Sequence, residues 1–193
     1  MKFLVLLANG NETIEVFTFV DYMRRIGVDV HMVSTTGSVD LVTSHSIKYQ
    51  ADFLLEDIDP NTYDGLYIPG GTKGAETLRD DERVIDIVKD FDQKEKIIAA
   101  ICAGPIVLDR AGVLVNKKAT SHPSIKDDLK NLGGYVDDQI VVTDGHITTS
   151  RGAALTNYLA LRVAQIVKGN EVSDELKIGI QQSSLEKFYG IEF

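Results

Sequence analysis

Short apolar runs alternate with longer helical stretches along most of this chain, and this alternation restricts its fold more than any other feature. Residues 2–8 are typical of a buried strand, residues 12–26 of a helix ended by Gly27, and residues 28–34 of a second strand. The pattern also predicts strands over 64–69, 96–101, 118–120, 134–136, 140–143 and 147–149, and helices over 73–79, 82–93, 103–111, 123–131, 153–168 and 171–180. Strands that alternate with helices predict an α/β fold, with a doubly wound, mostly parallel sheet and helices on both faces.

Some segments lie outside that simple alternation. The 12–26 helix is apolar on more than one side, so it is either sandwiched inside the fold or shared with a second subunit. Residues 37–51 predict a polar turn with a short β excursion, and Asp144-Gly145 predicts a hairpin turn. We expect the apolar side chains at the end of the chain to cover an apolar groove; these are Phe188, Tyr189, Ile191 and Phe193.

The composition is that of one substantial domain. The chain has 193 residues, 44% of them hydrophobic and only four of them proline. A chain of this length buries roughly 70% of the surface that its unfolded form exposes. There is no Ser/Pro-rich linker, so a single domain over residues 1–193 is predicted.

Charge and hydropathy exclude two classes of partner. The net charge of −9 argues against a general nucleic-acid-binding protein. No run approaches the ~20 apolar residues that span a bilayer, and residues 3–8 fit a buried strand better than a signal peptide. The single cysteine cannot form an internal disulfide, so we expect a reducing, cytoplasmic location.

That cysteine, Cys102, stands at the end of the apolar run 97–101 and directly before Ala103-Gly104-Pro105. A strand that ends at Cys102 and a helix that begins near Ala103 would place the sulfur where helix amides favour negative charge. At an ordinary pKa of ~8.5 only a few per cent of a thiol is ionised at neutral pH, and a drop of ~3 units would make it nearly all thiolate. A buried, inert cysteine is the alternative.

Three segments are expected to meet at this point, because ligands of doubly wound sheets bind beyond the carboxyl ends of the strands. They are residues 9–15, the Gly70-Gly71 turn and Cys102-Ala103. The amides of Gly71 and Ala103 could form an oxyanion hole. Pro69-Gly70-Gly71 could equally be a plain turn.

Several segments of the chain resemble those of a known family. The residues that carry the match are Gly10-Asn11-Glu12-Thr13-Ile14-Glu15, Pro69-Gly70-Gly71, Ala99-Ala100-Ile101-Cys102-Ala103-Gly104-Pro105, Thr120-Ser121-His122-Pro123 and Thr149-Ser150-Arg151-Gly152. Together they resemble the ThiJ/PfpI superfamily, and within it the branch that contains the Parkinson-associated protein deglycase. The resemblance covers about residues 2–180 and leaves 181–193 as a C-terminal extension.

The resemblance implies a flavodoxin-like fold, a homodimer and a set of site residues. Cys102 corresponds to the nucleophile, Glu15 to the acid held against the thiol, and His122 to a nearby histidine. The oxyanion amides correspond to Gly71 and Ala103. A carboxylate would repel a thiolate, so Glu15 should be protonated and donate a hydrogen bond to the sulfur.

Each residue also has a plainer interpretation. Glu15 could be a solvated first-turn glutamate, and His122 a capping or surface residue. The other histidines, His31, His45 and His146, carry no motif and are interpreted as structural or exposed. Arg151 is expected to anchor a loop near the site rather than to act chemically.

The resemblance favours a cofactor-free cysteine enzyme that acts on small reactive dicarbonyls, converting methylglyoxal to lactate or releasing it from glycated amines. The alternative is a non-enzymatic stress protein in which peroxide oxidises Cys102. A peptidase or amidase is disfavoured, because Ala103 occupies the position of the histidine that follows the nucleophile in protease-like members. The expected partners are a small aldehyde or peroxide and a second copy of the chain, with no metal, nucleic acid or membrane.

Overall fold

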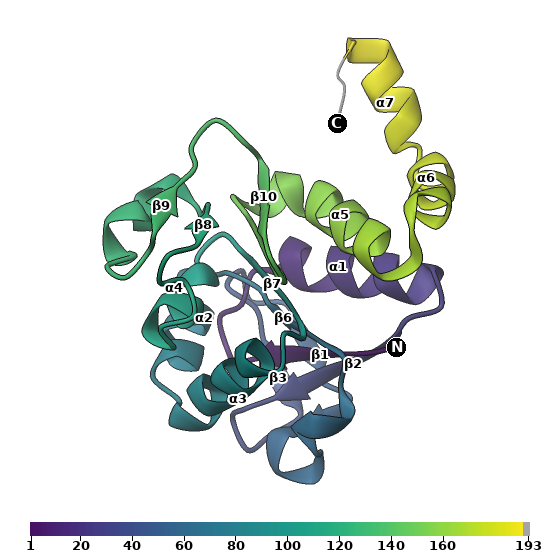
Figure 1. Ribbon diagram of the computed structural model, residues 1–193. Helices are drawn as coiled ribbons and strands as arrows, with labels where there is room; N and C mark the ends of the chain where they lie inside the picture. The colour runs from purple at the N-terminus through teal and green to yellow at the C-terminus, as the bar shows by residue number, and fades with distance from the viewer. Residues whose placement is uncertain (191–193) are drawn as a thin grey trace.

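The predicted parallel sheet is present in the computed structural model, which describes residues 1–190. Within that range, seven strands form the central sheet in the order β10-β11-β7-β6-β1-β2-β5 (Figure 1). Their bounds are β1 Lys2–Leu7, β2 Asp29–Ser34, β5 Phe53–Leu54, β6 Gly65–Ile68, β7 Ile97–Ile101, β10 Val141–Asp144 and β11 Ile147–Ser150. Neighbouring strands pair in parallel, except for β10 and β11, which are antiparallel.

Strand β1 lies in the middle of the sheet, and this position explains why its sequence is almost entirely apolar. Its residue Val5 pairs with Met32 of β2 on one side and with Tyr67 of β6 on the other. Residues 3–8 have no exposed surface, because helices cover both faces of the sheet at this point. A parallel strand buried on both faces is expected to show a continuous apolar run rather than an alternating one.

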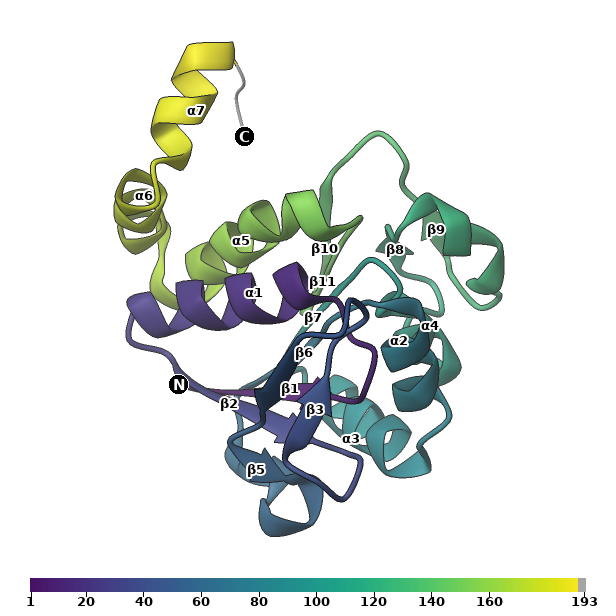
Figure 2. The ribbon, with the colours of Figure 1, turned by 180° about the vertical axis from the view of Figure 1, so that it is seen from behind.

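The helices form one layer on each face of the sheet (Figures 1 and 2). Helices α1 (Thr13–Arg25) and α5 (Thr156–Lys168) lie side by side on one face. Helices α2 (Thr72–Arg79), α3 (Glu82–Gln93) and α4 (Pro105–Arg110) cover the other face. Helix α6 (Asn170–Gly179) packs against α5, and α7 (Gln182–Tyr189) extends away from the sheet beyond α6.

Burial inside the fold accounts for most of the apolar surface of α1. Its side chains Val16, Phe19, Val20 and Met23 are buried in the core that α1 shares with α5. Phe19 stacks on Tyr67 of the sheet, with ring centroids 3.8 Å apart. Ile14, in contrast, remains 51% exposed. The prediction offered burial inside the fold or contact with a second subunit, and burial inside the fold applies to the four core residues of α1.

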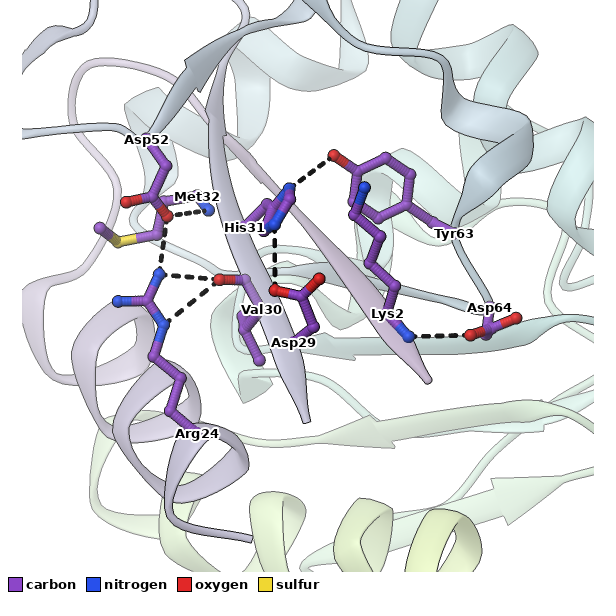
Figure 3. Close-up of polar contacts among 9 residues, drawn as sticks. All are labelled: Lys2, Arg24, Asp29, Val30, His31, Met32, Asp52, Tyr63 and Asp64. Atoms are coloured by element: carbon purple, nitrogen blue, oxygen red, sulfur yellow. Dashed lines mark hydrogen bonds and ion pairs between the residues drawn. The ribbon is translucent and has the colours of Figure 1, made fainter. Parts of the chain in front are cut away.

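A polar cluster ties α1 to the edge of the sheet near the beginning of β2 (Figure 3). Arg24 donates to the Val30 carbonyl and to the Asp52 carboxylate, both at 2.7 Å. His31 lies between Tyr63 and Asp29, with Nδ1 3.0 Å from the Tyr63 hydroxyl and Nε2 3.0 Å from the carboxylate. Because the strands are parallel, this cluster lies at the opposite end of the sheet from Cys102.

Two further pairs of short strands complete the described chain. Strands β3 (Asp40–Val42) and β4 (Lys48–Gln50) form an antiparallel hairpin, as the predicted β excursion required. Strands β8 (Lys118–Ala119) and β9 (Gly134–Tyr135) pair in parallel. The predicted hairpin after Asp144 is confirmed, with Gly145 in a positive-φ conformation between β10 and β11.

The structure differs from the prediction in several places, and the helix predicted over 103–111 is shorter, at Pro105–Arg110. The 123–131 segment is a short 3₁₀ helix over Pro123–Asp128 rather than an α-helix, and the two-residue strand β5 was not predicted. The groove-covering role was wrong for Phe188 and Tyr189, which are 82% and 68% exposed because α7 projects beyond the body of the fold (Figure 2). Ile191 and Phe193 lie outside the described residues. No helix within residues 1–190 combines the length and the apolar character that a membrane span requires.

Candidate active site

Cys102 occupies a sharp turn between β7 and α4. The strand ends at Ile101 as predicted, and Cys102 adopts φ +60°, a conformation that costs of order 1–3 kcal/mol for a residue with a side chain. Backbone hydrogen bonds hold the turn on both sides. The Cys102 amide donates to the Ser150 carbonyl at 3.0 Å, and its carbonyl accepts from the His122 amide at 3.0 Å. The β11 end and the His122 segment thus fix the position of the sulfur.

Glu15 reaches this turn from the first turn of α1. Its side chain has no exposed surface, and Oε2 accepts a hydrogen bond from the Gly70 amide at 2.7 Å. The Tyr67 hydroxyl donates to the Glu15 backbone carbonyl at 2.9 Å. Glu15 is therefore a buried acid beside Cys102, and the interpretation as a solvated first-turn glutamate is wrong.

The two predicted oxyanion amides, those of Gly71 and Ala103, both lie beside Cys102. The backbone N–H groups of Gly71 and Ala103 both direct hydrogen bonds at Cys102. Gly71 precedes α2 with φ +81°, and a Cβ atom there would lie 2.3 Å from the Gly10 carbonyl oxygen, so only glycine fits. The Gly-Gly turn is thus a close backbone approach between loops, rather than a plain surface turn.

Asn11 connects these loops and was not singled out from the sequence. It is fully buried; its Oδ1 accepts from the Ala8 amide at 2.7 Å and its Nδ2 donates to the Gly70 carbonyl at 2.9 Å. Gly74 of α2 packs directly against it, since a Cβ on Gly74 would lie 2.5 Å from the Asn11 amide nitrogen. Asn11 therefore joins the end of β1 to the turn that supplies the Gly71 amide.

The electrostatics of the pair differ from the prediction. Burial raises the pKa of Glu15 from 4.5 to about 7, against the opposing effect of the Gly70 hydrogen bond. Burial and then the nearby Glu15 charge raise the pKa of Cys102 to about 12, although the Gly71 and Ala103 amides oppose this rise. A lowered thiol pKa was predicted beside a protonated Glu15, whereas burial and an ionised Glu15 raise the thiol pKa. The reason is that the sulfur is half-buried beside an acid, so desolvation outweighs two hydrogen bonds.

These shifts indicate that the buried pair carries at most one negative charge near neutral pH. When Glu15 is ionised, its charge opposes ionisation of the thiol. When Glu15 takes up the thiol proton, that opposition disappears and its O–H can donate to the sulfur. The geometry therefore fits a thiolate generated by proton transfer from Cys102 to Glu15.

The pair opens into a cavity of about 350 Å³. The residues that line it are Glu12, Glu15, Ser44, His45, Gly71, Thr72, Cys102, Ala103, His122, Ser124, Ile125 and Ala153. This brings together all five of the predicted site residues. Five other polar residues line the cavity: Glu12, Ser44, His45, Thr72 and Ser124. The His45 side chain is 74% exposed, which agrees with its interpretation as structural or exposed.

His122 both caps a helix and faces this cavity. It precedes the Pro123–Asp128 helix, and its Nδ1 accepts from the Ser124 amide at 3.2 Å and lies 2.7 Å from the Ser124 hydroxyl. An amide N–H can only donate, so Nδ1 carries the lone pair and Nε2 carries the proton of the neutral ring. The capping interpretation is confirmed, and the ring presents a donor on its other nitrogen.

The surrounding groups are structural. Arg151 donates to the Asp137 carbonyl, which confirms that it anchors the loop before β10. Within the described part of the chain, no group of three or more His, Cys, Asp or Glu side chains could hold a metal ion. The chemistry that Cys102, Glu15 and His122 can perform is proton transfer and nucleophilic attack by sulfur.

Comparison with known proteins shows the family of this chain. The profile of the DJ-1/PfpI family matches residues 1–166, most of the chain. The chain belongs to the DJ-1/PfpI family. Protein dj-1beta of Drosophila melanogaster is 34% identical over 177 residues, which cover 92% of this chain and 95% of that protein. A deglycase of Thermococcus kodakarensis is 34% identical over 151 residues, covering 78% of this chain and 90% of that protein.

Solved DJ-1 structures share the fold. The crystal structure of Drosophila melanogaster DJ-1beta has a TM-score of 0.89 and covers 93% of this chain and 96% of its own, at 34% sequence identity. Oxidised DJ-1 of Toxoplasma gondii has a TM-score of 0.86 at 30% identity, covering 93% and 97% of the two chains. The flavodoxin-like α/β fold and the predicted family resemblance are thereby confirmed.

Proposed function

We propose that the protein is a cofactor-independent cysteine enzyme that converts small reactive dicarbonyls, such as methylglyoxal, to 2-hydroxy acids. The observation that carries this proposal is the Cys102 sulfur placed between a buried acid, Glu15, and the two amides of Gly71 and Ala103. The similarity to a protein named deglycase supports it. Release of the same dicarbonyl from a glycated amine would be deglycase activity, and either reaction would protect a cytoplasm under stress.

The first step is addition of sulfur to the aldehyde carbon. Glu15 takes the thiol proton, the S–C bond forms, and the carbonyl oxygen becomes an alkoxide that the Gly71 and Ala103 amides stabilise. With a pKa of about 7, Glu15 is well suited to give and take protons near neutral pH. Glu15 then returns the proton to the alkoxide, so the adduct is a hemithioacetal and Glu15 is again ionised.

The second step moves a hydrogen from the former aldehyde carbon to the neighbouring carbonyl carbon. A base removes the proton from the first carbon, and a solvent water delivers a proton to the second carbon. The hydroxyl proton passes from the first oxygen to the second, which yields a thioester of lactate on Cys102. Glu15 is placed to act as the base, and the Nε2–H of His122 to polarise the second carbonyl oxygen. Water then cleaves the thioester into lactate and the free thiol, so the overall reaction is redox-neutral.

The direct test is production of lactate from methylglyoxal by the purified protein. Cys102→Ala should lose all activity, because the bond-forming atom is gone. Glu15→Gln should lose at least about a hundredfold, the usual contribution of a general base. Absence of lactate with the wild-type protein, or full activity in Cys102→Ala, would contradict the proposal.

The second candidate function is a peroxide sensor without turnover. The observation that favours it is that the half-buried Cys102 sulfur faces an open cavity, where the amides that stabilise a thiolate would also stabilise a sulfinate. Intact-mass measurement after mild peroxide treatment separates the two. A selective gain of two oxygens on Cys102 with no dicarbonyl turnover favours the sensor.

We also propose that the protein acts as a homodimer. Apolar side chains remain exposed on the first turns of α1 and on the adjoining β3–β4 hairpin, notably Ile14 and Ile47. The ring contact of Phe17 with Tyr49, 5.2 Å between centroids, joins the two elements into one surface. Light scattering should give the mass of a dimer, and the double change Ile14→Glu with Ile47→Glu should give a monomer.

A further inference from the structure

The proposed reaction ends with hydrolysis of a thioester, and this step needs a base for the attacking water. Glu15 is poorly suited, because it holds the proton that the departing sulfur must recover. His122 is also unsuited, because its Nδ1 accepts from the Ser124 amide and its Nε2 therefore carries a proton. A third titratable group lining the cavity, His45, has no role in the first two steps.

His45 lies in the loop of the β3–β4 hairpin and is held by two neighbours. Its Nδ1 is 2.9 Å from the Ser44 hydroxyl oxygen and 3.3 Å from Glu12 Oε2. The Ser44 hydroxyl in turn donates to the same Glu12 oxygen at 2.9 Å. All three side chains line the cavity that contains Cys102.

The arrangement of these atoms determines where the proton of the imidazole lies. The single Ser44 hydroxyl proton is directed at the Glu12 carboxylate, so Ser44 can only accept from Nδ1. The carboxylate is likewise only an acceptor, so Nδ1 must carry a hydrogen and Nε2 keeps its lone pair. Nε2 of His45 is therefore a proton acceptor, whereas Nε2 of His122 is a proton donor.

The carboxylate that orients His45 is itself well fixed. The Glu12 side chain is only 17% exposed, whereas that of His45 is 74% exposed. The Glu12 amide donates to the Gly70 carbonyl at 3.1 Å, which ties Glu12 to the same turn that positions Glu15. A histidine oriented by a carboxylate and open to solvent on its far nitrogen is the arrangement of a water-activating base.

We propose that His45, oriented by Glu12 and Ser44, is the general base for hydrolysis of acyl groups on Cys102. The inference rests on the proposed function, because it concerns the acyl intermediate formed there. Nε2 takes a proton from water as its oxygen bonds to the acyl carbon. The C–S bond then breaks, the sulfur leaves as a thiolate that recovers a proton from Glu15, and the carboxylic acid departs. His45 returns its proton to solvent.

The test uses para-nitrophenyl acetate, which acylates a cysteine and releases a coloured product in that step. A burst of nitrophenolate reports acylation of Cys102, and the later steady rate reports hydrolysis of the acyl enzyme. His45→Gln should leave the burst amplitude unchanged and lower the steady rate at least about tenfold. Glu12→Gln should lower the steady rate in the same direction, and mass spectrometry should show acetyl-Cys102 accumulating in both variants.

The control is a second carboxylate-bound histidine far from the cavity. His31 pairs with Asp29 at 3.0 Å at the other end of the sheet (Figure 3). His31→Gln should therefore preserve both the burst and the steady rate of nitrophenolate release. An unchanged steady rate in His45→Gln with an intact burst overturns this inference and leaves the proposed function standing. Absence of acetyl-Cys102 by mass spectrometry in both the wild-type protein and His45→Gln overturns both, because Cys102 would then not be acylated.

Discussion

The Glu15 carboxyl group and the Cys102 side chain meet across Gly70, a residue without a side chain. The Gly70 amide donates to Glu15 Oε2 at 2.7 Å. A Cβ atom on Gly70 would lie 2.6 Å from both Glu15 Oε2 and Cys102 Cβ, and 2.8 Å from the Ala103 nitrogen. The spacing of acid, sulfur and oxyanion amide thus depends on the absence of one methyl group.

Gly70→Ala should therefore abolish activity and destabilise the fold. Real Cβ atoms do not approach other atoms this closely, so either the Cys102 turn or the Glu15 side chain must move. Overpacking of this kind costs about 1–3 kcal/mol of unfolding free energy, which urea denaturation would measure. Gly179→Ala in α6 is the control, because nothing lies within 4 Å of its Cβ position and it should be neutral or slightly stabilising. Wild-type turnover in Gly70→Ala would show that the spacing does not matter.

The second prediction concerns ionisation of the thiol. Burial and the Glu15 charge place the pKa of Cys102 at about 12. Glu15→Gln removes the charge but not the burial, so Cys102 should titrate at lower pH than in the wild-type protein. Thiolate absorbance in the ultraviolet, followed against pH, measures this directly. A thiol pKa that is the same in the wild-type protein and in Glu15→Gln would contradict the effect of the Glu15 charge described here.

The sequence predicted the sheet and the meeting of the site residues well, for a physical reason. Runs such as Phe3–Leu7 and Ile97–Ile101 are buried on both faces, so their composition alone identifies central parallel strands. The position of Cys102 at a strand end then follows from the chain order, and parallel strands bring such ends together.

What could not be predicted depends on distances between segments far apart in the chain. The direction in which the pKa of Cys102 shifts depends on whether desolvation outweighs two amide hydrogen bonds. The amino-acid sequence alone does not show which effect is larger. The Glu12–His45 contact needs the β3–β4 hairpin to fold over the loop after β1. Phe188 was expected to cover an apolar groove, but apolar residues near the end of a chain do not reveal whether a surface lies opposite them.

The third prediction is a pH dependence of stability that Glu15→Gln removes. The unfolded chain titrates Glu15 near 4.5 and the folded protein near 7, so the folded state binds more protons between these values. Stability from this group is complete below pH 4.5 and is lost as the pH rises through about 7, because the buried carboxylate must then ionise. The rise in the pKa of Glu15 corresponds to about 3 kcal/mol of unfolding free energy.

Glutamine carries no charge, so the variant avoids this loss. Relative to the wild-type protein, Glu15→Gln should gain about 3 kcal/mol of unfolding free energy on going from below pH 4.5 to above pH 7. Urea denaturation of both proteins across this range gives the difference. A difference that does not change with pH would mean that Glu15 titrates as an ordinary glutamate.

The last prediction concerns Asn11, which touches neither the sulfur nor the acid. Asn11→Ala removes the acceptor of the buried Ala8 amide and the donor to the Gly70 carbonyl, and leaves a cavity beside Gly74. Unsatisfied buried polar groups cost about 1–3 kcal/mol each, so a loss of about 2–4 kcal/mol is expected. Because Gly70 would be released, the Gly71 amide should also lose its alignment with the sulfur, and turnover should fall further than stability alone explains. Asn61→Ala, at an exposed site, should stay within about 0.5 kcal/mol of wild type in denaturation and retain full turnover. If Asn11→Ala unfolds at the wild-type urea midpoint, the loop after β1 does not support the oxyanion hole.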